Sequence, residues 1–80
     1  MTGWREAAIG FEFDDIKICN LSVWKEEWRP VPIDPPILPH PAYPNQMHRY
    51  DVYEIGDKIR PVRFAASELS AGVWGFYVPA

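Results

Sequence analysis

Hydrophobic and polar residues alternate near the start of the chain. Residues 8–13 (Ala-Ile-Gly-Phe-Glu-Phe) alternate as a half-buried strand does, and residues 16–18 (Ile-Lys-Ile) resume the alternation after two aspartates. A two-residue turn at the aspartates pairs the two segments as a hairpin with complementary neighbours. The expected pairs are Phe13 with Ile16 and Phe11 with Ile18 on one face, and Glu12 with Lys17 on the other.

The stretch that follows admits two interpretations. One is a strand over residues 16–23, which two isoleucines and a valine favour because β-branched residues suit strands. The other is a helix over residues 15–29, in which four apolar side chains approach a helical stripe and the proline at position 30 ends the helix. We favour the strand and expect one helical turn at residues 25–27 (Lys-Glu-Glu).

Residues 50–55 and 59–64 form a second hairpin pattern. A three-residue loop of Gly-Asp-Lys between them sets apolar residues opposite apolar ones and acids opposite bases, whereas a two-residue loop mixes the two kinds. The predicted pairs are Ile55 with Ile59, Val52 with Val62, Tyr50 with Phe64, Glu54 with Arg60, and Asp51 with Arg63. Because Pro61 has no N–H to donate, we expect its strand to be bulged or to lie at a sheet edge.

The last sixteen residues complete the expected fold. Residues 65–71 (Ala-Ala-Ser-Glu-Leu-Ser-Ala) predict a short helical turn that Gly72 ends, and residues 73–78 predict a final strand. The fold class is therefore mainly β, or α+β with little helix. We expect about five antiparallel strands in a small sheet or partly closed barrel, in a single domain over residues 1–80.

A proline-rich segment is the most distinctive feature of the chain. Seven of the fifteen positions 30–44 are proline, so the segment is expected to form a long extended loop close to polyproline II. It carries too many apolar residues for a solvated linker. One interpretation is that the segment packs along the domain's own core, and the other is that it offers a ligand to an aromatic groove on a partner. Packing on the core is favoured.

Composition narrows the class of protein. Eighty residues suit one domain, and the single cysteine, Cys19, allows no internal disulfide, unlike secreted domains of this size. No leader pattern is visible and no apolar run approaches the roughly 20 residues that span a bilayer. These features predict a cytoplasmic protein, in the host cell if it is viral, that does not bind membranes. The net charge of −3 disfavours nucleic acid as a partner.

Chemistry-bearing residues are sparse. His40 and His48 have no credible third ligand at metal spacing, so they are a poor zinc signal. Cys19, His48 and Asp51 have the residue types of a catalytic triad, but any chain with these residue types permits such a grouping. We expect Cys19 to be a small buried hydrophobic residue. We therefore predict no catalytic, metal or cofactor residues and do not expect an enzyme.

Aromatic and proline residues point instead to binding. Tryptophan and tyrosine are the commonest anchors at binding hot spots, and rigid surfaces lose little entropy on contact. The candidate partner-binding residues are Trp24, Trp28, Ile37, Leu38 and Tyr43.

The sequence thus predicts a small module that docks on a larger partner protein, as an inhibitor or adaptor. One alternative is a structural protein that self-assembles, so a homo-oligomer is compatible with the pattern. Another is a small β-barrel that binds nucleic acid through Lys58, Arg60 and Arg63.

Overall fold

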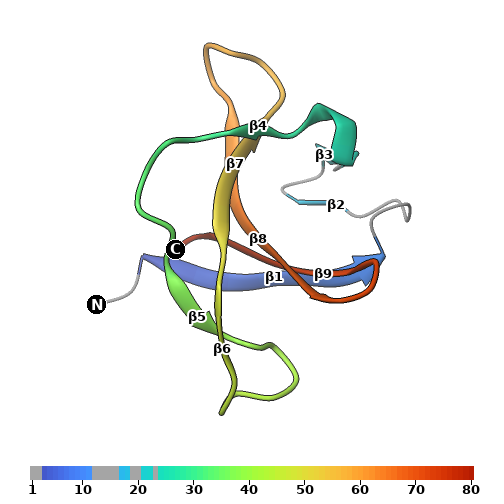
Figure 1. Cartoon of the computed structure of the whole chain (residues 1–80). Helices are drawn as coiled ribbons and strands as arrows, with labels where there is room; N and C mark the ends of the chain where they lie inside the picture. Colours follow the sequence, from blue (N-terminus) through green and yellow to red (C-terminus); the bar gives the residue numbers. More distant parts are fainter. Residues whose placement is uncertain (1–2, 12–16, 19–20, 23) are drawn as a thin grey trace.

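The computed structural model describes residues 3–11, 17–18, 21–22 and 24–80, and most of these are in strands (Figure 1). The elements are β1 (Trp4–Phe11), β2 (Lys17–Ile18), β3 (Leu21–Ser22), the 3-10 helix η1 (Lys25–Glu27), β4 (Arg29–Pro30), β5 (Ile37–Pro39), β6 (Met47–Arg49), β7 (Asp51–Ile55), β8 (Val62–Ser70) and β9 (Val73–Pro79).

Five strands form one antiparallel sheet in the order β1-β9-β8-β7-β4, and the pairs β2–β3 and β5–β6 are separate. β1 and β4 are the two edges of this order, so the sheet is open and is not a barrel. Within the described residues, helix is limited to η1. The predicted mainly β fold with about five antiparallel strands is therefore confirmed. No helix in the described part of the chain is long and apolar enough to cross a membrane.

One face of the sheet is covered by a tryptophan. Trp28, between η1 and β4, places its ring centroid 5.2 Å from those of Tyr53, Phe64 and Trp74. Edge-to-face contacts of this kind add to the stabilisation that burial provides. We call this side the Trp28 face. Its buried side chains are Ile55, Phe64, Ala66, Trp74, Phe76 and Val78.

The opposite face is also apolar and is covered by the β5–β6 pair. Val52, Ala65 and Tyr77 of the sheet form a buried cluster with Leu38 of β5 and with Tyr50, which joins β6 to β7. We call this side the arm face. A sheet covered on both sides explains why the final strand is apolar at almost every position, as buried strands are, and does not alternate.

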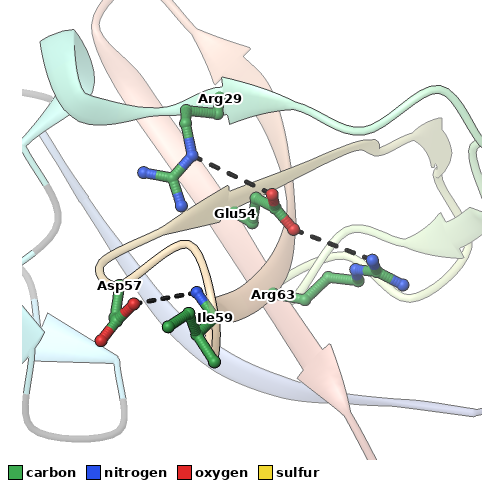
Figure 2. A network of polar contacts seen from close by, with 5 residues as sticks. All are labelled: Arg29, Glu54, Asp57, Ile59 and Arg63. Atoms are coloured by element: carbon green, nitrogen blue, oxygen red, sulfur yellow. Dashed lines mark hydrogen bonds and ion pairs between the residues drawn. The ribbon is translucent and has the colours of Figure 1, made fainter.

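The hairpin of β7 and β8 differs from the prediction in register. Ile55 pairs with Val62 and Glu54 pairs with Arg63, so the connection is the six-residue segment 56–61 and not a three-residue loop. Val52 pairs with Ala65, Tyr53 with Phe64, and Asp51 with Ala66, which replaces every predicted pair. Figure 2 shows the consequence: the Glu54 carboxylate lies 3.8 Å from Nη2 of Arg63 and 3.9 Å from Nε of Arg29.

The physical reason for the shift is burial. The three-residue loop would have placed Ile59 in the sheet, but the structure leaves it in the connection, and Phe64 is fully buried against Trp28. Packing on that face therefore decides the register, and local turn chemistry does not. Pro61 lies just before β8, where no ladder N–H is needed, and β8 is an interior strand; the expected edge or bulge at Pro61 is wrong.

The helical turn predicted over residues 65–71 is also wrong. β8 continues through this region to Ser70, because Ala65 and Ala66 are buried on opposite faces of the sheet and that burial outweighs their helix propensity. Gly72 adopts a positive φ of 73° in the two-residue turn that leads to β9, so it ends a strand and not a helix. The predicted final strand is confirmed as β9.

The N-terminal expectations are resolved in part. β1 pairs with β9 and β2 pairs with β3, so Phe11 lies opposite Val73 and Ile18 opposite Leu21. The predicted turn at residues 14–15 and its pairs through residues 12, 13 and 16 lie outside the described residues, and so does Cys19. The strands at 17–18 and 21–22 exclude the helix over residues 15–29, and the helical turn at 25–27 is confirmed as η1.

The proline-rich segment does not form the single long loop that was expected. It begins in β4, which pairs with β7, and contains β5, which pairs with β6. Leu38 of β5 is buried in the core of the arm face. Short strands thus fasten the segment at two points, and residues 31–36 connect them.

Candidate functional site

The five predicted partner-binding residues divide into two groups. Trp28 and Leu38 pack in the two hydrophobic cores, whereas Trp24, Ile37 and Tyr43 expose 39%, 57% and 60% of their surface. Two of the exposed residues, Ile37 and Tyr43, lie in the β5–β6 unit, and Trp24 lies just before η1. We call residues 37–49, comprising β5, β6 and the loop between them, the docking arm.

The register of the docking arm sorts its side chains into two sides. Leu38 lies opposite His48, and both are at least partly buried, so this side faces the sheet. Neighbouring positions point the other way in a strand. Ile37 and Met47 are accordingly exposed, at 57% and 56%, on the outer side.

Two tyrosines fasten the inner side. The hydroxyls of Tyr50 and Tyr77 both donate to the carbonyl oxygen of Pro39, at 3.1 and 2.8 Å. Their rings meet edge-to-face with centroids 4.9 Å apart. Burial, followed by the charges of Tyr77 and Glu6, raises the pKa of Tyr50 to about 12. Burial and then Glu6 also raise the pKa of Tyr77, so both hydroxyls keep their protons and remain donors at neutral pH.

The loop at the tip of the docking arm is held by its own polar contacts. Nδ1 of His40 accepts hydrogen bonds from the backbone N–H groups of Ala42 and Tyr43, at 2.9 and 3.2 Å. The His40 N–H donates to the Gln46 carbonyl at 2.7 Å, and the Gln46 N–H donates to the Tyr43 carbonyl at 2.9 Å. The Tyr43 ring rests 4.9 Å from the His40 ring. Tyr43 is therefore exposed but held in a defined position.

Sequence reasoning missed Met47 and the structural use of His40. The signal for Met47 was the alternation within residues 47–50, where buried Tyr50 and inward His48 imply that position 47 faces outward. The signal for His40 was an acceptor side chain placed just before a turn, the position at which a side chain bonds to backbone N–H groups two and three residues on.

Catalytic geometry does not emerge in this region. The His40 and His48 rings lie 5.6 Å apart, but the described residues contain no group of three or more His, Cys, Asp or Glu side chains that could hold a metal ion. Because Cys19 lies outside the described residues, its arrangement with His48 and Asp51 stays a hypothesis. What the arm offers chemically is apolar surface on a fixed backbone.

No family model, curated protein or solved structure matches this chain.

Proposed function

We propose that this chain is a small protein-binding module that docks on a larger partner protein through the outer side of its docking arm, as an inhibitor or adaptor. One observation carries the proposal. Ile37, Tyr43 and Met47 each expose more than half of their surface on one short arm whose backbone is fastened to the sheet. Clustered exposure of large apolar side chains is typical of an interaction surface.

Preorganisation supports the same function. Ordering a side chain and its loop at an interface costs about 0.5–1.5 kcal/mol for each flexible side chain. In the docking arm the His40 contacts fix the loop before a partner arrives, and the Pro39 carbonyl is fixed by two hydroxyls. The cost of ordering the loop backbone is therefore met in folding, so on binding mainly the side-chain cost remains to offset the gain from burying the three apolar side chains.

The surroundings of the docking arm suit a protein partner better than nucleic acid. Arg49, opposite Ile37, pairs with Asp51 at 3.0 Å in an exposed ion pair, so the charge beside the apolar patch is balanced. An apolar centre with a polar rim is the usual anatomy of a protein interface. Of the basic residues considered for nucleic acid, Arg63 is paired with Glu54. We place the interaction in the cytoplasm, of the host cell if the protein is viral.

The test compares three tagged baits in lysate of the native host, with captured proteins identified by mass spectrometry. The baits are the wild-type protein, the arm variant Ile37→Ser/Met47→Ser, and the matched control Ile9→Ser, which removes an isoleucine of similar exposure (49%) from β1. A true partner is enriched by the wild type and the control and lost with the arm variant. Thermal melts verify that all three baits are folded.

Calorimetry with the purified partner then measures how much Tyr43 contributes to the binding free energy. Tyr43→Ala should weaken binding by about 2 kcal/mol or more, the range of a hot-spot tyrosine, with an unchanged melting temperature. Partners that bind the arm variant and the wild type equally would contradict docking through the arm.

A further inference from the structure

Among the side chains that the structure describes, the most exposed large apolar one lies away from the docking arm. Ile59 exposes 87% of its surface in the segment 56–61, between β7 and β8. Figure 1 shows this connection at the top of the view and the β5–β6 loop at the bottom. The docking arm therefore does not account for Ile59.

The Ile59 loop has a defined backbone. Gly56 begins it with a φ of 85°, a conformation that glycine adopts without strain. The Asp57 carboxylate accepts the N–H of Ile59 at 2.8 Å, as Figure 2 shows. Lys58 and Arg60, on either side of Ile59, are exposed. The loop thus presents an apolar tip between two positive charges.

A hollow of about 320 Å³ lies between the segment that follows β4 and the start of β7. Two backbone hydrogen bonds mark its ends. The Val31 N–H donates to the Val52 carbonyl at 2.9 Å, and the Tyr50 N–H donates to the Pro36 carbonyl at 3.0 Å. Between these bonds, residues 32–35 leave the strand and enclose the hollow. Pro32 and Pro35 in the intervening segment have a fixed φ and no N–H to pair with β7. The lining residues are Pro30, Val31, Pro32, Ile33, Pro35, Arg49, Asp51, Val52 and Tyr53.

The lining and the charge of the hollow complement those of the Ile59 loop. Seven of its nine lining residues are proline or carry apolar side chains, although polar atoms make up the larger part of the surface they expose. Its volume is at the lower end for small-molecule sites, which suits an inserted side chain better than a cofactor. Two acids accompany it: Asp51 lines it, and exposed Asp34 lies between the lining residues Ile33 and Pro35. Arg49 is engaged with Asp51. Since Arg49 and Asp51 balance each other, Asp34 gives the rim of the hollow a net negative charge, and that charge complements a tip flanked by cations.

We infer that a second copy of this chain is the occupant: Ile59 of one copy enters the hollow of the other, and Lys58 and Arg60 meet Asp34 and Asp51. The loop and the hollow border the same strand, since Asp51–Tyr53 line the hollow and the loop starts after Ile55. Two copies related by a two-fold axis along this side of the sheet exchange both contacts and form a closed dimer. The contact is small, so the dimer is weak and concentration-dependent.

Sedimentation velocity of the purified protein alone tests this inference, over about 10 µM to about 1 mM. The wild type should shift from monomer to dimer across the range. Ile59→Ser should weaken dimerisation about tenfold or more, because it removes the inserted side chain. Tyr43→Ser, on the docking arm, is the matched control and should dimerise as the wild type does, so failure of the arm proposal leaves this result untouched.

Charge reversal gives the decisive comparison. Lys58→Glu/Arg60→Glu places acids against an acidic rim, and Asp34→Lys/Asp51→Lys places bases against a basic loop, so each double variant alone should be monomeric. Mixed in equal amounts, the two variants should dimerise, because each loop then faces a rim of opposite sign. A wild type that stays monomeric throughout, a dimer indifferent to Ile59→Ser, or a mixture that remains monomeric would each overturn the inference.

Discussion

The two faces of the sheet are covered in different ways. On the Trp28 face, one indole ring meets the rings of Tyr53, Phe64, Trp74 and Phe76 at centroid distances of 5.2–5.6 Å. On the arm face, a strand pair is held by two hydroxyls on the Pro39 carbonyl as well as by buried Leu38.

This difference separates core from surface. Apolar contact is non-directional, so the Trp28 cover mainly removes surface from water. Hydrogen bonds are directional, so the cover on the arm face has a fixed orientation and presents a defined outer side. Trp28 completes a core, whereas the docking arm completes a core with one side and exposes Ile37 and Met47 on the other.

Truncating one aromatic residue of each kind should give the largest difference between the two covers. Trp28→Ala should destabilise the protein by about 3–5 kcal/mol, since it removes the ring that four aromatic side chains pack against. Tyr43→Ala should change stability by less than about 0.5 kcal/mol, because that ring is 60% exposed. Urea unfolding of both variants measures the two effects. Equal losses of stability would contradict the assignment of Trp28 to the core and Tyr43 to the surface.

The same pair shows what the sequence could predict. The fold class, β9 and the helical turn at η1 could be predicted from the alternation, the β-branched residues and the composition. Leu38 was predicted to bind a partner, but it is buried in the core of the arm face. Trp28 and Tyr43 were not separable, because both are aromatic residues in or beside the proline segment. Which of them meets the sheet depends on β7–β9, which lie far along the chain.

Burial on two faces explains the other failures. A strand covered on one side alternates, but in β8 both faces are covered at Phe64, Ala65 and Ala66, which are buried in succession. The two adjacent alanines at the start of residues 65–71 therefore break the alternation, and the segment was predicted to be helical. In the hairpin before them, Ile59 satisfied the apolar pattern as well as Val62 does, and only the packing of Phe64 on Trp28 distinguishes the two registers.

Raising the pH tests the hydroxyls that fasten the arm face. Burial raises the pKa of Tyr50 from 10.0 to about 12, so folding favours the neutral phenol. Its contribution to stability is complete below pH 10 and is lost as the pH rises from 10 to 12. The expected loss is about 2–3 kcal/mol above that range, and an ionised Tyr50 can no longer donate to Pro39.

Urea unfolding from pH 8 to pH 12 (~0.5-unit steps) measures the loss. Tyr50→Phe should reduce the alkaline loss and leave the part that Tyr77 contributes, because burial raises the pKa of Tyr77 as well. An unchanged profile in that variant would assign the alkaline loss to other groups.

Removing one hydroxyl should have a smaller effect on the same face. Tyr77→Phe deletes the 2.8 Å bond to the Pro39 carbonyl and should cost about 1 kcal/mol, since Tyr50 still donates to that oxygen. Hydrogen exchange at the His40 N–H, which bonds to Gln46, should quicken as the docking arm loosens. Tyr43→Phe is the control, because the Tyr43 side chain is exposed. Faster exchange in the control would mean that the loop, and not the Pro39 fastening, sets the rigidity of the arm.

The smallest expected effect concerns the polar side chains on the arm face near the end of β7. Glu54 lies two residues from buried Val52 on the same side of β7, and it lies between Arg29 and Arg63, as Figure 2 shows. All three side chains are partly exposed, so the Glu54–Arg63 pair, at 3.8 Å, should contribute only about 0.2–1 kcal/mol. A double-mutant cycle with Glu54→Gln and Arg63→Gln measures this coupling, and Arg60→Gln supplies the matched cycle. Arg60 lies in the connection beyond the paired strands, so its coupling to Glu54 should be indistinguishable from zero. The reverse result, with Arg60 coupled and Arg63 not, would restore the three-residue loop and move Ile59 from the surface into the sheet.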